Sequence, residues 1–330
     1  MMLRKKKYSK ESSSGFLLIG DKYWMTSLIP PQGRKFRFDL DYSNKYRSSY
    51  IDMTGYEVGP NSTIQHNIKS LLGAKEISLI DQYAEELQVE NLDLIVNYGV
   101  MYWVVRPLWV ALDYLFKFTN NYGYSIILLT ILIRLVFFPL NQYSMKSMAR
   151  IKALTPQMNI IKDKYKEDKQ QQQKEIMKLY KQNSVNPASS CFPIFIQIPI
   201  FFSLYKLLLL DIAMRHAPFI WIWEDLASKD PLSVFNLFGL IPFNVPGFLE
   251  IGLLPCLMGA SMYVQMKLSP QATGNDQMAQ MQQKIFKFFP LFLTVILAGF
   301  ASGLVLYWTM TNLLTIVQQY VINRSIKVKE

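Results

Sequence analysis

Long hydrophobic runs alternate with polar segments only in the part of this chain of 330 residues that follows position 98. The runs that have membrane-spanning length occupy about residues 123–142, 190–210, 249–267, 285–301 and 303–322. A helix of roughly 20 apolar residues crosses the roughly 30 Å of a bilayer core. The pattern predicts an all-α polytopic membrane protein, with a five-transmembrane-helix core over residues 123–322.

The last two runs lie so close together that we expect an antiparallel helical hairpin. Their junction, residues 299–304, consists mainly of small residues. A tight turn of this kind places its tip at one membrane face, because irregular backbone is not tolerated in contact with lipid.

Basic residues predict the orientation of this core. The connection over residues 143–190 contains ten Lys and Arg residues and four acidic residues, so we expect it in the cytoplasm. The connection over 211–248 contains two basic and four acidic residues and is expected outside. A basic tail, residues 323–330, places the C-terminus in the cytoplasm.

Arg134 interrupts the first apolar run, residues 123–140. A charge at the centre of a membrane helix costs about 2.5–3.5 kcal/mol on insertion scales, so it usually faces water, protein or a polar substrate. The simpler interpretation is that Arg134 snorkels toward the nearer membrane surface. The arrangement of the neighbouring polar residues favours a functional role instead.

Polar side chains form a stripe along one face of both the first and the last run, at 100° per residue. The stripe residues are Thr130, Arg134 and Asn141 in the first run, and Trp308, Asn312, Thr315 and Gln319 in the last. Gln197, Ser261 and Gln265 add polar positions to two other runs. Such residues often bond one membrane helix to another. With an arginine among them, we expect a hydrated cavity.

The region before the core, residues 1–97, reads as a small exoplasmic β-rich remnant and a connector. Short runs at 22–29, 36–42 and 48–53 are separated by turn residues and predict strands, and residues 70–87 predict a helical connector. The basic N-terminus has no apolar run long enough for an anchor. Either an upstream anchor is absent or the chain begins inside a longer protein, and we expect the second.

Residues 98–122 are predicted to form an interfacial amphipathic helix. This segment is rich in aromatic residues, and its charged residues Arg106, Asp113 and Lys117 fall on one helical face. A true membrane span is the alternative, but it would reverse the orientation that the basic residues predict.

The cytoplasmic connection is predicted to form a helical hairpin over residues 143–185, with helices at about 145–165 and 169–182. Met145, Met148 and Met177 are candidate contacts for varied apolar segments, because methionine is flexible and polarizable. The alternative is that the methionines pack the hairpin against itself.

Candidates for catalysis are few. The chain has no phosphate-binding glycine loop and no zinc pattern, and only two histidines and two cysteines. With 51% hydrophobic residues, the composition indicates a membrane protein. We therefore expect no enzyme activity, no cofactor and no metal. The net charge of +11 suits anionic lipid or ribosomal RNA, although no specific nucleic-acid motif is present.

Six segments carry a family resemblance: residues 121–140, 145–158, 182–208, 214–231, 262–270 and 301–322. Together they resemble the YidC-type bacterial membrane protein insertases. The resemblance covers roughly residues 20–326. It implies a five-helix core in the bacterial inner membrane, with a groove open to the cytoplasm and the lipid.

The resemblance also implies which residues line the groove. Arg134 matches the arginine of the family, and the other substrate-binding candidates that it implies are Thr130, Gln197, Tyr307, Trp308, Asn312 and Thr315. The implied partners are nascent membrane proteins, the Sec translocon, the ribosome and membrane lipids.

The hypothesis is a membrane protein insertase and folding chaperone that works without nucleotide hydrolysis. Its groove receives the hydrophilic flank of a nascent protein, and the apolar segment passes into lipid. The alternatives are a small-solute or ion transporter with an anion site at Arg134, and a structural assembly subunit.

Overall fold

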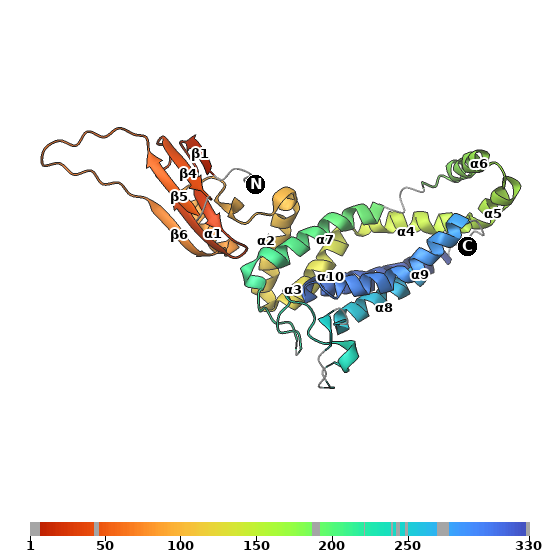
Figure 1. Ribbon diagram of the computed structural model, residues 1–330. Coiled ribbons are helices and arrows are strands. Elements are labelled where there is room, and N and C mark those ends of the chain that lie inside the picture. The colour runs from red at the N-terminus through yellow and green to blue at the C-terminus, as the bar shows by residue number, and fades with distance from the viewer. Residues whose placement is uncertain are drawn as a thin grey trace. The chain divides into compact units, whose positions relative to one another are not determined.

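The computed structural model divides the chain into two compact units. One unit comprises Met1–Tyr102 with Leu210–Ala213, and the other comprises Trp103–Leu209 with Met214–Glu330. Figure 1 shows the strands of the first unit and the helices of the second. The structure describes residues 7–42, 46–186, 192–220, 222–238, 240–241, 245–247, 250–268 and 277–327.

The first unit contains two antiparallel sheets of three strands each. One sheet has the order β1-β4-β5 and the other β2-β3-β6. Their bounds are β1 Lys7–Ser12, β2 Leu17–Gly20, β3 Trp24–Ile29, β4 Phe36–Asp41, β5 Arg47–Asp52 and β6 Lys69–Ala74. Helix α1, Ile77–Leu87, and the short helix η1, Leu92–Ile95, follow.

A small apolar core joins the two sheets. Leu17 of β2 packs with Phe36, Phe38 and Leu40 of β4, and these side chains are buried. The three β4 residues alternate with half-buried ones, as expected for a strand that buries one face. This core explains why a region with so few strands folds as a β unit.

The predicted strands at 22–29, 36–42 and 48–53 coincide with β3, β4 and β5. The helical connector predicted over 70–87 is wrong in its first part, because residues up to Ala74 belong to β6. That strand pairs with β3, with Thr26 opposite Leu72. A pairing between positions so distant in sequence overrides the local helical pattern.

Asp52, at the end of β5, accepts hydrogen bonds that hold the following segment. The Tyr56 hydroxyl donates to its Oδ2 at 2.6 Å and the Thr54 backbone N–H to its Oδ1 at 2.8 Å. His66 Nδ1 lies 3.5 Å from Oδ2. These bonds stabilise the charged carboxylate and lower the pKa of Asp52 to about 2.

Asp52→Asn is therefore expected to destabilise this unit at pH 7 and to have little effect near pH 2. The pKa of Asp52 is lower in the folded than in the unfolded chain, so its stabilising effect is present above about pH 4 and is lost as the pH falls toward 2. Protease resistance of residues 7–102 across this pH range measures the effect. Glu57→Gln, an exposed change of equal charge, is the control. A stability difference that does not change with pH would contradict the assignment.

The second unit consists mainly of helices. Their bounds are α2 Tyr102–Thr119, α3 Tyr122–Val136, α4 Phe138–Ala153, α5 Thr155–Lys164, α6 Lys169–Gln182, α7 Phe192–Leu210, α8 Leu253–Leu268, α9 Gln277–Leu297 and α10 Ser302–Lys327. Helix α10 packs against α8, α3 and α4, and α8 also packs against α9. Helix α10 therefore makes the most extensive helix–helix contacts in the described part of this unit.

Helix α2 coincides with much of the predicted interfacial segment. Trp103, Tyr114 and Phe118 are 82%, 74% and 80% exposed, whereas Val105 and Leu112 on the opposite side are buried. Lys117 pairs with Asp113 at 2.7 Å, and the Arg106 guanidinium lies over the Trp109 ring. An exposed aromatic face beside paired charges is typical of helices that lie at a membrane surface.

The first predicted span is bent. Helix α3 ends at Val136, and α4 begins at Phe138 with a different direction, at a bend of 65°. Pro139 has no N–H to donate to the carbonyl group four residues earlier, which explains the break at this point. The single helix predicted over 123–142 is therefore two helices, and Asn141 lies on a different one from Thr130 and Arg134.

In the described residues, no helix by itself has both the length and the hydropathy of a membrane span. The bent pair Tyr122–Val136 and Phe138–Ile151 has both when taken together. Phe195–Leu210 and Lys287–Leu297 are apolar but shorter. The number of five spans stays a prediction.

Candidate functional site

Arg134 is held against the backbone of α10. It is partly buried, and its Nη2 donates to the Thr311 carbonyl oxygen at 3.1 Å. That oxygen also accepts from the Thr315 hydroxyl at 2.7 Å. No ion pair joins Arg134 to an acidic group among the described residues. A guanidinium has five N–H donors, so Arg134 keeps capacity to bind an anionic or carbonyl group.

A second polar contact joins α7 to α10. Gln197 Nε2 donates to the Tyr307 hydroxyl at 2.8 Å. Tyr307 is 2% exposed, whereas Gln197 is half-buried. One turn away, the rings of Phe201 and Trp308 meet edge to face at 4.9 Å. Trp308 is also half-buried, so this side of α10 is partly accessible.

A third polar contact joins α8 to α10. Asn312 Nδ2 donates to the Ser261 hydroxyl at 3.1 Å and to the Met258 carbonyl oxygen at 3.3 Å. All three residues are buried. This contact is typical of the interhelical bonds that join apolar helices. Asn312 therefore holds the helices together and does not face an open cavity.

The predicted site residues divide into two groups. Arg134, Gln197 and Trp308 are partly accessible. Thr130, Tyr307, Asn312 and Thr315 are buried, and Thr130 bonds only to the Ile126 carbonyl oxygen within its own helix in the described contacts. Four of the predicted residues form hydrogen bonds that involve a residue of α10, namely Arg134, Gln197, Asn312 and Thr315. Thr130 takes part in none of those bonds.

Thr311, whose carbonyl oxygen accepts the hydrogen bond from Arg134, was not among the site residues predicted from the sequence. It lies one helical turn from both Tyr307 and Thr315, so the spacing of four could have indicated it. A backbone acceptor, however, gives no signal through its own side-chain type.

One loop holds the first turns of three helices. Asn121 caps α3, with its Oδ1 accepting from the Gly123 N–H, and its Nδ2 donates to the Phe219 carbonyl oxygen at 2.7 Å. The Ser302 N–H of α10 donates to the Ser228 carbonyl oxygen at 2.7 Å. The loop thus satisfies backbone groups that the helices cannot pair themselves.

The same loop reaches α8 through Asp230. This buried carboxylate accepts from the Leu254 N–H in the first turn of α8 at 2.7 Å and from the Leu232 N–H at 3.1 Å. Gly252 lies so close that an added Cβ would be 2.4 Å from the Asp230 Cβ. Three helix N-termini are therefore tied together by Phe219, Ser228 and Asp230, which we call the helix clamp.

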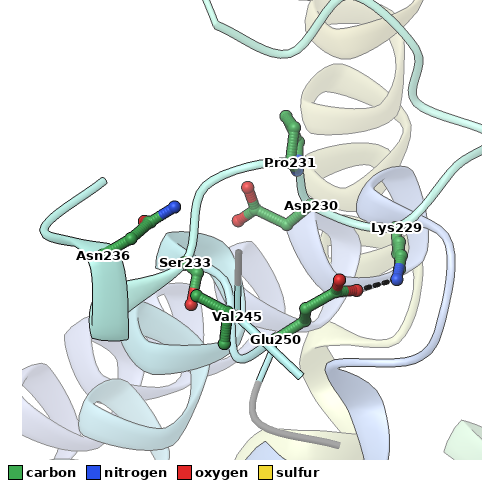
Figure 2. Close-up of a pocket in the computed structure, with 7 residues that line it drawn as sticks. All are labelled: Lys229, Asp230, Pro231, Ser233, Asn236, Val245 and Glu250. Atoms are coloured by element: carbon green, nitrogen blue, oxygen red, sulfur yellow. Dashed lines mark hydrogen bonds and ion pairs between the residues drawn. The ribbon is translucent and has the colours of Figure 1, made fainter. Parts of the chain in front are cut away.

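A cavity of about 360 Å³ lies beside the helix clamp, and Figure 2 shows the residues that line it. Its lining residues are Lys229, Asp230, Pro231, Ser233, Asn236, Val245 and Glu250. Lys229 and Glu250 form an ion pair across it. Both carboxylate oxygens of Asp230 already accept hydrogen bonds from backbone N–H groups. The buried carboxylate is therefore accounted for by its role in the helix clamp.

The helical hairpin formed by α5 and α6 has an apolar core of its own. Leu154, Leu179 and Val185 are buried together, with Met158 and Tyr180 packed against them. Met145 and Met148 lie on α4 outside this core and are half-buried, whereas Met177 is 50% exposed. Self-packing therefore accounts for Met158, while Met177 is free of this core and accessible.

Leu179→Ala is expected to loosen the hairpin, because truncating a buried leucine costs about 2–5 kcal/mol. Met177→Ala, two residues away on the exposed side, should cost little. Limited proteolysis of α5 and α6 in membranes would compare them. Equal protease sensitivity of the two variants would contradict this core.

The helices and contacts define a class: a helical protein in which polar groups from several apolar helices meet on one central helix. Comparison with known proteins agrees with this class. Residues 114–330 match the family described as 60Kd inner membrane protein, and residues 1–111 match the YidC periplasmic domain. The chain belongs to this family of inner membrane proteins.

Two curated relatives are named membrane protein insertase YidC. The relative from Pelagibacter ubique is 48% identical over 327 residues, which cover 99% of this chain and 58% of the relative. The relative from Brucella suis is 41% identical over 97% of this chain and 52% of the relative. The chain thus spans between half and three-fifths of their lengths.

A solved structure has the same fold. The crystal structure of an active YidC insertase with its first transmembrane domain resolved matches with a TM-score of 0.52 and 22% identity. The match covers 97% of this chain and 66% of that chain. The family matches and the two relatives together confirm the resemblance to the YidC-type family.

Proposed function

We propose that this protein is a membrane protein insertase and folding chaperone of the bacterial inner membrane. The observation that carries the proposal is the setting of Arg134, a cation between apolar helices whose hydrogen bond goes to a backbone carbonyl and not to an acid. The membership of a family with relatives named as insertases supports it.

In this mechanism the half-buried face of α10 receives the polar flank of a nascent membrane protein. Arg134 attracts acidic or carbonyl groups of the flank, and Gln197 and Trp308 offer an amide and an aromatic edge beside it. The apolar segment of the substrate passes into lipid, where burial of its surface drives the reaction. No nucleotide hydrolysis is needed for these steps.

The proposal includes the predicted topology. The five-helix core is multi-pass with a cytoplasmic C-terminus, and α2 lies on the outer membrane surface with Trp103, Tyr114 and Phe118 toward lipid. The partners are nascent membrane proteins and membrane lipids, with the Sec translocon and the ribosome on the cytoplasmic route. The buried site residues shape the groove in this mechanism; they are Thr130, Tyr307, Asn312 and Thr315.

Reconstitution in lipid vesicles tests this function. A single-span substrate with a polar flank should become protected from added protease without ATP when the protein is present. Protection no greater than in empty vesicles would contradict the proposal. Solute efflux from the same vesicles would instead identify a transporter.

A further inference from the structure

Six apolar side chains are exposed within one short segment of the connection between α7 and α8. We call this set the apolar loop tip; its residues are Val234, Phe235, Leu237, Phe238, Leu240 and Ile241. Leu240 is 82% exposed and Phe235 is 51% exposed. Single exposed apolar residues are common on protein surfaces, but a group of this kind marks a contact with lipid or with another protein. The proposed insertase mechanism uses none of these residues.

The segment around the apolar loop tip carries no charge. Residues 231–249 include no Lys, Arg, Asp or Glu. The nearest charged residues flank the segment, with Lys229 and Asp230 before it and Glu250 after it, and Lys229 forms an ion pair with Glu250. Apolar residues at lipid depth, with charged residues kept on the water side, are the pattern found at membrane interfaces.

The backbone of the apolar loop tip is also suited to lipid. All six of its N–H groups donate to acceptors within the protein. The acceptors are the Ile251 carbonyl oxygen for Val234 at 3.0 Å, the Ser233 hydroxyl for Phe235 at 3.3 Å, the Val234 carbonyl for Leu237 at 3.2 Å, the Ser233 carbonyl for Phe238 at 2.8 Å, the Leu237 carbonyl for Leu240 at 3.3 Å and the Asn236 carbonyl for Ile241 at 3.1 Å. An unpaired backbone donor cannot enter lipid, because no water is there to replace the missing bond. A loop that stays in water has no such requirement.

Two residues of the apolar loop tip have a strained backbone. Leu237 and Phe238 have φ angles of +49° and +60°, in the left-handed region that is costly for residues with bulky side chains. Such strain persists only where other contacts fix the backbone, and it is concentrated at functional positions. Here the short helix η5, Val234–Asn236, precedes the two residues, and the bond from Phe238 to Ser233 closes the turn. Both strained residues present exposed side chains.

The apolar loop tip is attached to the start of an apolar helix. Ser233 pairs with Gly252 in an antiparallel bridge, and α8 begins at Leu253 (Figure 1). In the proposed topology, this end of α8 lies at the outer surface of the membrane. A loop bonded to it is within reach of the outer leaflet.

We propose that the apolar loop tip inserts into the outer leaflet of the bilayer and anchors the connection between α7 and α8 to the membrane. None of its six side chains can form an ion pair or a hydrogen bond, whereas a specific protein interface uses such bonds beside its apolar contacts. Lipid requires only apolar surface with a satisfied backbone. This anchor goes beyond the insertase function and rests only on the topology proposed with it.

Spin labelling of the full chain in lipid vesicles tests the anchor. With Cys191 and Cys256 replaced by alanine, a nitroxide is attached at Leu240→Cys or, in a separate variant, at Phe235→Cys. Oxygen concentrates in the apolar part of a bilayer and a nickel chelate stays in water, so the ratio of oxygen to chelate access should be at least about threefold higher at both positions than at an exposed polar position. Both residues are exposed, so the labels should leave the melting temperature unchanged.

Two control positions separate failure of the anchor from failure of the topology. Glu224→Cys, exposed in the same connection, reports water, and Val264→Cys, on α8 and 46% exposed, reports lipid. Chelate access at both tip positions with Val264 in lipid overturns the anchor and leaves the topology standing. Chelate access at Val264 as well overturns both. Low access of both agents at the tip would mean a contact with protein, such as a second copy of this chain, and also overturns the anchor.

Discussion

Arg134→Ala is expected to slow the insertion of substrates with acidic exported flanks at least about tenfold, and of neutral flanks only about twofold. A tenfold change corresponds to about 1.4 kcal/mol, which is a modest part of the attraction between opposite charges about 4 Å apart near a protein surface. Arg134→Lys should be milder, because it keeps the charge but loses the planar donor geometry.

The measurement is protease protection of paired substrates that differ only in the charge of the flank. Leu135→Ala is the matched control, because Leu135 is the next residue of α3 and is 64% exposed. Equal loss for acidic and neutral flanks in Arg134→Ala would contradict the electrostatic role. Added salt should weaken the preference for acidic flanks if the groove is hydrated.

Asp230→Ala is expected to lower the melting temperature of the protein by about 5–10 °C. The change removes two hydrogen bonds from backbone N–H groups to a buried carboxylate, each worth about 1.5–3 kcal/mol, and leaves the Leu254 N–H of α8 without its acceptor. It also removes a negative charge from a helix N-terminus.

Thermal unfolding in detergent, followed by the loss of helical signal, measures this effect. Glu250→Gln is the control, since Glu250 lines the same cavity but makes a partly exposed ion pair with Lys229. Such pairs contribute about 0–1 kcal/mol. Similar losses in the two variants would contradict the helix clamp.

Much of the candidate site could be predicted because helical periodicity places side chains on faces. Asn312 and Thr315 belong to the stripe predicted on the last run. On α10, Asn312 bonds Ser261 of α8, and Thr315 donates to the Thr311 carbonyl oxygen that also accepts from Arg134. Periodicity cannot say whether a polar residue faces water or another helix. Asn312 was for this reason expected at a cavity, whereas its side chain is buried and bonds Ser261 of α8.

The break between α3 and α4 could not be located by counting apolar residues. Leu135, Val136 and the next two phenylalanines continue the apolar run without a change of composition. Pro139 was part of that run, and its effect on the hydrogen bonds of the preceding turn decides the bend. Hydropathy alone therefore predicted one helix where there are two.

The helix clamp and the smaller strands depend on contacts between distant positions. Asp230 bonds Leu254, Asn121 bonds Phe219, and residues of β6 pair with residues of β3 that lie 40 to 50 positions earlier. No local pattern carries such pairings. The apolar helices and their polar faces can therefore be predicted from local sequence patterns, whereas the loops that hold them cannot.

Photo-crosslinking from Trp308 to a stalled single-span substrate tests the central claim most directly. The account predicts crosslinks from Trp308 at intermediate chain lengths only, and none of this transient kind from Leu313 on another face of α10, which is 43% exposed. A lack of crosslinks from Trp308 at every chain length would contradict a substrate groove on this helix, provided that the hairpin is still accessible to protease in the same membranes.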